Sequence, residues 1–257
     1  MTNTTDIADT TAITEITAIP AIPDTRAITD TDVTTAPNGT TVTAAPDAAA
    51  APGAGGAPGG PQLPDPRPLF RRAGDLASSV VAEVRADQLD ARTPCDEFTV
   101  YELVDHMWMA LRRIGAIGAG WDAFGPTSEL PSGLAFDDLK VSLNEKIETA
   151  ESTWSDAALL SPLFELPWAT MPGAAVLTLY VSEITVHTWD LATTLGLAVE
   201  FDDAVTGAAL GLMRMALPAN GRNAMLAPFH DAVPTAADAP LIDQLVAWTG
   251  RDPLVAL

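Results

Sequence analysis

The sequence predicts an all-α fold: a four-helix bundle with one or two extra C-terminal helices, preceded by a disordered N-terminal tail. From residue 63 onward, apolar residues recur at three- and four-residue steps, which is the spacing of one buried helix face. No segment shows a convincing alternation of apolar and polar residues, the pattern expected of a half-buried strand. Four of the expected helices are long enough to pack together as a bundle.

The first 62 residues differ in composition from the rest of the chain. They contain 15 Thr, seven Pro, six Gly and no aromatic residue, and the first aromatic of the chain is Phe70. Such a segment buries too little apolar surface to offset the entropy of ordering its backbone, roughly 1–2 kcal/mol per residue. We therefore expect a disordered low-complexity tail at 1–62 and a helical domain at 63–257.

Local signals place the first three helices of this domain. The first is expected at 68–85, where apolar side chains share one face. The second should begin at residue 100, because Thr99 and Glu102 have the spacing of a capping box. Three glycines weaken its far end, and a third helix is expected at 137–154.

The second half of the domain is expected to hold three more helices. Segment 160–173 is interrupted by three prolines and should be a loop or a short extended piece. The most apolar helix follows at 173–195 and should end at Gly196, a C-cap residue. A fifth helix should begin after an aspartate cap at 202 or 203, and a short sixth helix is expected at 240–249.

Charge and cysteine content exclude several classes of protein. The net charge of −21 argues against binding to nucleic acid, because no basic field exists to displace counterions. The single cysteine, Cys95, cannot form an intrachain disulfide and is interpreted as a packing residue. No apolar stretch approaches the roughly 20 residues needed to span a bilayer, and the N-terminus lacks the pattern of a signal peptide. We expect a cytoplasmic protein without nucleic-acid or membrane partners.

The expected helix at 173–195 carries the clearest chemical signal. Glu183 and His187 lie about 40° apart on one helix face, among apolar neighbours. An ionised carboxylate buried there alone would cost several kcal/mol, so it needs a partner or a proton. An i,i+4 carboxylate and imidazole can converge on one cation. The alternative is a buried hydrogen bond between Glu183 and His187.

The expected helix after residue 100 offers a third candidate. His106 projects about 90° from the apolar centre of this helix, at the boundary with polar residues. A boundary histidine is either a half-exposed side chain without a role or a ligand at an open cleft. His230, in the loop PFHDAV, is interpreted as exposed.

Two segments carry a resemblance to a known family: DHMWMALRR, which contains His106, and SEITVHTWDLATTLG, which contains Glu183 and His187. They resemble the DinB/YfiT-like metalloenzymes and, more narrowly, the metal-binding domain of the actinobacterial mycothiol-dependent maleylpyruvate isomerase family. The resemblance extends over roughly residues 69–253 and implies a four-helix bundle whose metal is held by His106, Glu183 and His187. Three protein ligands leave a coordination position open, as in catalytic metal sites.

The resemblance implies the chemistry of a thiol. Two nitrogen ligands and one oxygen ligand favour zinc as the divalent metal. The metal would bind mycothiol or a similar thiol as a thiolate, which would attack a small electrophile. The isomerase carries a further mixed α/β domain after its bundle, whereas only about 60 residues follow Gly196 here. The resemblance therefore supports a metal site more strongly than isomerase activity, and an S-transferase remains open.

Two functions without catalysis also remain open. The first is a non-catalytic bundle that binds a metal or ligand for sensing or storage. The second is a metal-free interaction domain, which would place His106 far from the Glu183/His187 pair. If the protein is an enzyme, its expected partners are a small-molecule substrate and the thiol, and it is expected to be a monomer or homodimer.

Several charged residues have two interpretations, and no catalytic residue is assigned. Arg113 is a candidate for binding the thiol cofactor. Arg112, Arg113 and Arg222 could bind an anionic substrate, although such arginines are more often surface charges. Asp190 follows His187 by three residues and could orient its imidazole. An ordinary solvent-facing position is the preferred interpretation of Asp190.

Overall fold

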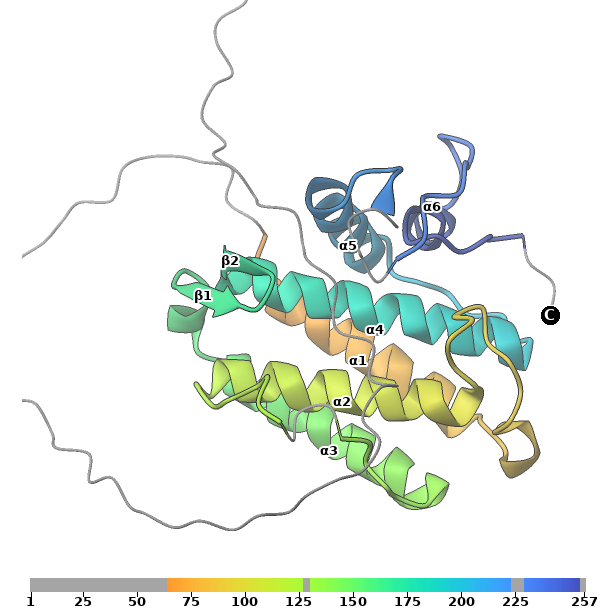
Figure 1. The fold of residues 1–257 in the computed structure, drawn as a ribbon, viewed down its shortest axis with the longest axis horizontal. Coiled ribbons are helices and arrows are strands. Elements are labelled where there is room, and N and C mark those ends of the chain that lie inside the picture. The colour runs from red at the N-terminus through yellow and green to blue at the C-terminus, as the bar shows by residue number, and fades with distance from the viewer. Residues whose placement is uncertain (1–63, 127–129, 223–228, 255–257) are drawn as a thin grey trace, which may run out of the picture.

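The computed structural model describes residues 64–126, 130–222 and 229–254, so the tail expected at 1–62 lies outside the described residues. Within these ranges the chain is mostly helical, which confirms the expected fold class (Figure 1). No helix among these residues is both long and apolar enough to cross a membrane. The elements are α1 (Arg67–Ala82), α2 (Val100–Gly118), α3 (Phe136–Trp154), β1 (Leu163–Leu166), β2 (Ala169–Pro172), α4 (Gly173–Leu195), α5 (Asp203–Ala216) and α6 (Leu241–Trp248).

Helices α1 to α4 form the bundle. α1 packs against α3 and α4, and α2 packs against the same two helices, so the four helices surround one core. Trp154 at the end of α3 is fully buried, and its indole N–H donates to the carbonyl oxygen of Ile114 in α2 at 2.9 Å. The core side chains with no more than 1% exposure include Phe70, Val100, Leu103, Met107, Leu111, Ile114, Leu139, Leu143, Trp154, Val176, Leu177, Val181, Ile184 and Leu191.

The expected capping box fixes the start of α2 and thereby the position of His106. The hydroxyl oxygen of Thr99 accepts the backbone N–H of Glu102, and the Glu102 carboxylate accepts the backbone N–H of Thr99 at 2.8 Å. Such a cap stabilises a helix by about 1 kcal/mol. α2 begins at Val100, as the sequence predicts. His106 therefore lies in the second turn of a helix whose register is locally determined.

Helix α4 is enclosed on several sides, in agreement with its apolar sequence. α1 and α2 pack on it within the bundle, while α5 and α6 cover it from outside. A second apolar cluster joins α4 to these outer helices: Val186, Ala209, Leu210, Met213, Leu217 and Leu245. The helix ends at Gly196, whose φ of 66° is left-handed and suits a glycine C-cap. The backbone carrying Glu183 and His187 is thus held on several sides by packing.

The structure differs from the sequence-based expectation between α3 and α4. β1 and β2 form an antiparallel hairpin in which Leu163 pairs with Pro172 and Leu166 pairs with Ala169. The expectation of no strand is wrong here, whereas the alternative of a short extended piece is confirmed. Strands of four residues are too short to show a readable alternation of apolar and polar residues. At the turn, Trp168 packs edge-on against Phe124, with ring centroids 5.1 Å apart.

Candidate metal centre

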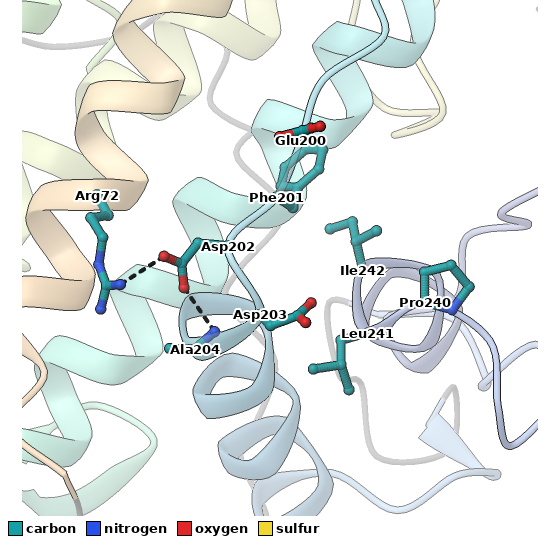
Figure 2. Close-up of a pocket in the computed structure, with 9 residues that line it drawn as sticks. All are labelled: Arg72, Glu200, Phe201, Asp202, Asp203, Ala204, Pro240, Leu241 and Ile242. Atoms are coloured by element: carbon teal, nitrogen blue, oxygen red, sulfur yellow. Dashed lines mark hydrogen bonds and ion pairs between the residues drawn. The ribbon is translucent and has the colours of Figure 1, made fainter.

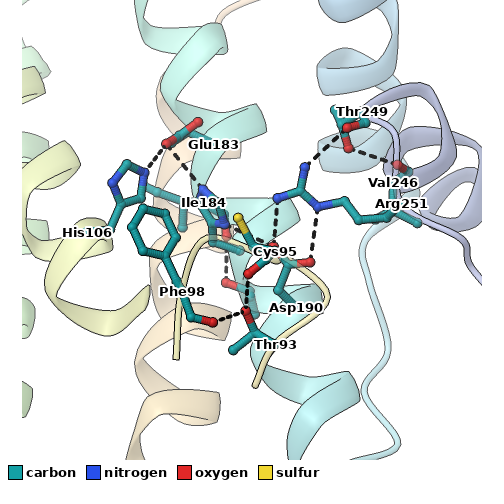
Figure 3. Close-up of polar contacts among 12 residues, drawn as sticks. Thr93, Cys95, Phe98, His106, Glu183, Ile184, Asp190, Val246, Thr249 and Arg251 are labelled. Atoms are coloured by element: carbon teal, nitrogen blue, oxygen red, sulfur yellow. Dashed lines mark hydrogen bonds and ion pairs between the residues drawn. The ribbon is translucent and has the colours of Figure 1, made fainter. Parts of the chain in front are cut away.

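The bundle brings together three side chains that the sequence singled out, although 77 residues separate His106 from Glu183. Nε2 of His106 lies 2.8 Å from Oε1 of Glu183, and Nε2 of His187 lies 3.4 Å from the same oxygen. The two imidazole centroids are 5.0 Å apart. Figure 3 shows His106 reaching from α2 toward Glu183 on α4. The alternative of a metal-free interaction domain would have placed His106 far from this pair, which is not the arrangement in the structure.

The geometry of this cluster fits a divalent cation. One ligand atom from each of His106, Glu183 and His187 lies within 4.8 Å of the other two. Tetrahedral zinc with ligands at about 2.0–2.2 Å separates its ligand atoms by about 3.4 Å. The Glu183–His187 separation matches this value, whereas the shorter Glu183–His106 separation is that of a hydrogen bond. The donor set and the spacing of Glu183 and His187 suit zinc, and the role of these residues as ligands stays a prediction.

The cluster reaches solvent on one side. The side chains of His106 and Glu183 are 25% and 26% exposed, while that of His187 is 7% exposed. His187 therefore forms the inner wall of the cluster, and His106 and Glu183 form its outer edge. A cation held here would keep a solvent-facing position, as catalytic metal sites do.

His106 is held by a residue that sequence reasoning missed. The ring of Phe98 stacks on the His106 imidazole, with centroids 4.9 Å apart and planes inclined by 26°. Phe98 precedes the N-cap of α2, and its carbonyl oxygen accepts the hydroxyl of Thr93 at 2.9 Å. This contact fixes the loop that carries the aromatic ring. An aromatic residue directly before a helix cap was the available signal in the sequence.

His187 is oriented by Asp190. Nδ1 of His187 donates to Oδ2 of Asp190 at 3.0 Å, which leaves Nε2 directed at Glu183. The side chain of Asp190 is fully buried. It also receives two hydrogen bonds from Arg251, a residue that the sequence did not single out (Figure 3). The preferred interpretation of Asp190 as solvent-facing is therefore wrong, and its alternative role in orienting His187 matches the geometry.

These contacts shift the pKa values of the cluster. Burial alone would lower the pKa of His187, but the charge of Glu183 and the hydrogen bond to Asp190 outweigh it and raise the pKa to about 9. Burial would raise the pKa of Glu183, but the charge of His187 and the hydrogen bond from His106 hold it well below its usual value. Without metal, His187 is thus an imidazolium and Glu183 a carboxylate at neutral pH. A metal bound at Nε2 of His187 would displace the proton from that atom.

The arginines named from the sequence lie outside this cluster. Arg113 follows His106 by seven residues, which places it on the same face of α2 about 10 Å along the helix. Its guanidinium lies over the ring of Phe124 at 5.4 Å. Arg112 lies over Trp108 at 5.3 Å. The role of Arg113 in binding a cofactor stays a prediction.

Arg222 corrects a further expectation. Its side chain is fully buried, and it donates to the carbonyl oxygens of Pro218 and His230 at 2.6 Å and also to that of Trp248. It is therefore neither a surface charge nor available to a substrate. The side chain of His230 is 68% exposed and lies beside Asp96, outside the candidate centre. The sequence-based interpretation of His230 as exposed is confirmed.

Cys95 lies at the back of the candidate centre. Its thiol is within 4.8 Å of ligand-type atoms of His187 and Asp190. Burial raises the pKa of this thiol to about 12, although the charge of Arg251 opposes the shift. Cys95 therefore remains a protonated thiol at neutral pH, a poor nucleophile. This agrees with its interpretation as a packing residue.

An open hollow exists elsewhere on the molecule, where α1 meets α5 and α6. Figure 2 shows Arg72 of α1 beside Asp202, the N-cap of α5, and their side chains form an ion pair at 2.6 Å. Leu241 and Ile242 of α6 form its opposite wall. None of the three ligand candidates lines this hollow.

Comparison with known proteins gives three kinds of similarity. Residues 70–192 match the family model of the mycothiol maleylpyruvate isomerase N-terminal domain. Two uncharacterized proteins of Mycobacterium tuberculosis, from strains CDC 1551 / Oshkosh and ATCC 25618 / H37Rv, are each 29% identical over 187 residues. Each alignment covers 73% of this chain and 98% of the relative.

Among solved structures, the crystal structure of the mycothiol-dependent maleylpyruvate isomerase is similar with a TM-score of 0.49 and 15% identity. This similarity covers 59% of this chain and 68% of that one, and a mutant of the same enzyme gives the same values. The family match includes the bundle except for the first turn of α1 and the last residues of α4. It contains all three ligand candidates. Residues 70–192 are therefore similar to the mycothiol maleylpyruvate isomerase N-terminal domains.

Proposed function

We propose that His106, Glu183 and His187 hold a divalent cation, zinc by their donor set, and that the protein uses it with a low-molecular-weight thiol. The similarity of residues 70–192 to the mycothiol maleylpyruvate isomerase N-terminal domain supports mycothiol as this thiol. The reaction would be an isomerisation or an S-transfer on a small electrophile. The convergence of two imidazoles and one carboxylate from α2 and α4 carries this proposal.

Each protein group has a task in this proposal. Asp190 holds Nδ1 of His187, so that Nε2 faces the site. Phe98 fixes the ring of His106 by stacking, and Glu183 supplies the negative charge. A bound zinc supplies a Lewis acid that lowers the pKa of a coordinated thiol, as it does for bound water. The sulfur would add to an activated double bond and leave again in an isomerisation, or displace a leaving group from carbon in a transfer.

The exposure of the cluster favours an enzyme over a sealed structural site. His106 and Glu183 each leave about a quarter of their side chain open, 25% and 26%, so a thiol can approach from their side. The alternative is a non-catalytic bundle that holds a metal or ligand for sensing or storage. It would need the same three ligands but no approach for a second reactant.

Arg113 is our candidate for contacting an anionic group on the thiol or the electrophile. It lies on the same face of α2 as His106, about 10 Å away along the axis. Its guanidinium is half-buried and lies over Phe124, and a planar guanidinium can bind a carboxylate in bidentate fashion. We further propose that the protein is cytoplasmic and is a monomer or homodimer. The net charge of −21 disfavours nucleic acid as a partner.

Elemental analysis of the full chain, purified without a polyhistidine tag, tests the proposal first. About one equivalent of zinc or another divalent metal is expected, and its loss in His106→Ala but not in His230→Ala would identify the ligands. His230 is a matched control, because it is exposed and outside the cluster. A screen of thiols against small electrophiles follows. Metal without thiol turnover would favour the non-catalytic alternative, and no metal in the wild type would refute both.

A further inference from the structure

A line of buried charged groups connects the candidate metal centre to the segment after α6. We propose that Arg251 is a positioning residue of the metal centre: through Asp190 it fixes the imidazole of His187 in the orientation that binds metal. The C-terminal segment would then complete a centre whose ligands all lie in residues 70–192. The inference rests on the proposed function.

The contact between Arg251 and Asp190 is bidentate and buried. Nε of Arg251 donates to Oδ1 of Asp190 at 3.1 Å, and Nη2 donates to Oδ2 at 2.9 Å. The side chains are 9% and 0% exposed. Oδ2 also accepts the Nδ1–H of His187. Both carboxylate oxygens are thereby used, and the paired bonds fix the plane of the carboxylate (Figure 3).

Asp190 needs Arg251 as its partner in order to hold the imidazole of His187 in place. A carboxylate buried without a cation is costly, and it either takes up a proton or turns toward water. In either case Asp190 would no longer hold Nδ1 of His187 as an ionised acceptor in a fixed plane. The imidazole could then rotate, and Nε2 would lose its fixed position beside Glu183. Outer partners of this kind typically change metal affinity by about 10–100-fold.

The backbone after α6 is shaped to deliver Arg251 to this position. α6 is anchored by its buried Leu245 and by the indole of Trp248, which donates to the carbonyl oxygen of Met213 at 3.0 Å. Gly250 then adopts a φ of 91°, which favours glycine, and a Cβ there would lie 2.7 Å from the Cβ of His230. The backbone N–H of Arg251 donates to the carbonyl oxygen of Val246 at 2.9 Å. This tight turn directs the Arg251 side chain toward α4.

Arg222 provides a matched control for a merely structural role. It is also a buried arginine of the C-terminal part, but it donates to backbone carbonyl oxygens and contacts none of the ligand candidates. Arg222→Gln should lower the melting temperature without changing the metal site. Arg251→Gln should change both, and Arg251→Lys, which keeps the charge but loses the planar fork, should lie between wild type and Arg251→Gln.

The experiment uses the full chain, stripped of metal and titrated with zinc and, separately, with cobalt. Arg251→Gln is expected to lower zinc affinity about 10-fold or more and to change the visible absorption of bound cobalt. Arg222→Gln should keep both within about twofold of the wild type, as expected of a residue that touches no ligand. If Arg251→Gln does not fold, the double variant Arg251→Met/Asp190→Asn removes both charges together and should show the same weakened affinity.

Wild-type affinity and an unchanged cobalt spectrum in Arg251→Gln, or in the double variant, would overturn the inference and leave the proposed function intact. An equal loss of affinity in Arg222→Gln would overturn it as well, because the effect would then be one of general stability. Failure of the wild type to bind either metal would instead remove the proposed function.

Discussion

Replacing Glu183 by Gln tests the candidate centre most directly, because it removes one negative charge and keeps the shape of the side chain. Oε1 of Glu183 lies within 3.4 Å of the Nε2 atoms of both His106 and His187. The amide can still form one of these hydrogen bonds, so the bundle should stay folded. A directly ligating carboxylate should matter more than an outer partner, so we expect zinc affinity to fall by at least about 100-fold, or roughly 2.7 kcal/mol.

The same substitution has a predictable effect on the metal-free protein. The pKa of His187 is raised from 6.5 to about 9, and Glu183 is the strongest of the groups that raise it. Since the folded pKa lies above the unfolded one, this stabilisation is fully present below about pH 6.5 and is lost as the pH rises through about 9. A shift of this size corresponds to at most roughly 3 kcal/mol. In Glu183→Gln the loss between these pH values should shrink to the part due to Asp190.

Urea unfolding of metal-free wild type and variant across this pH range measures the second effect, and zinc titration measures the first. Arg251 and Cys95 do not interfere, because the pKa of Cys95 is about 12 and that of Arg251 is raised. Equal zinc affinity in the two proteins would refute Glu183 as a ligand. Wild-type stability that does not fall between pH 6.5 and 9 would refute the charged Glu183–His187 pair.

Three further outcomes are expected. Deleting residues 1–62 should leave the melting temperature within about two degrees, because that composition contributes little buried surface; protection of tail amides from hydrogen exchange would argue the opposite. Phe98→Ala should cost about 1–2 kcal/mol and weaken zinc binding, because the His106 ring loses its stacking partner at 4.9 Å; denaturation and zinc titration check this, and an unchanged affinity would mean that the stacking is irrelevant. Gly250→Ala should destabilise the fold by more than about 1 kcal/mol, because φ is 91° there; a variant with wild-type thermal stability would contradict this.

Much of the fold could be predicted because the signals are local. α2 begins where the capping box of Thr99 and Glu102 predicts, and α4 ends where the glycine cap at Gly196 predicts. The pairing of Glu183 with His187 follows from helix geometry alone. The arrival of His106 beside them does not follow from local rules. It was expected from the family resemblance, and the packing of α2 against α4 brings it about.

The parts that escaped prediction depend on contacts distant in sequence. Arg251 and Asp190 are 61 residues apart, and no periodicity links a residue after a short helix to the interior of α4. Arg222 was ambiguous for the same reason, since its partners are backbone carbonyl oxygens brought together by tertiary packing. Polar residues in loops suggest exposure, yet two arginines in loops of the described part of the chain, Arg222 and Arg251, are buried.

The charges at the centre connect these observations to the proposed thiol. Without metal, Glu183 and Asp190 are negative, while His187 and Arg251 are positive, so the four charges sum to zero. Exchange of the His187 proton for a divalent cation would raise this sum to +1. A partly buried site with one excess positive charge favours an anion in its open position. A thiolate supplies that single negative charge, whereas a neutral thiol or water does not. Arg251 thus offsets the charge of Asp190, and without it the loaded centre would already be neutral and would bind a thiolate less strongly.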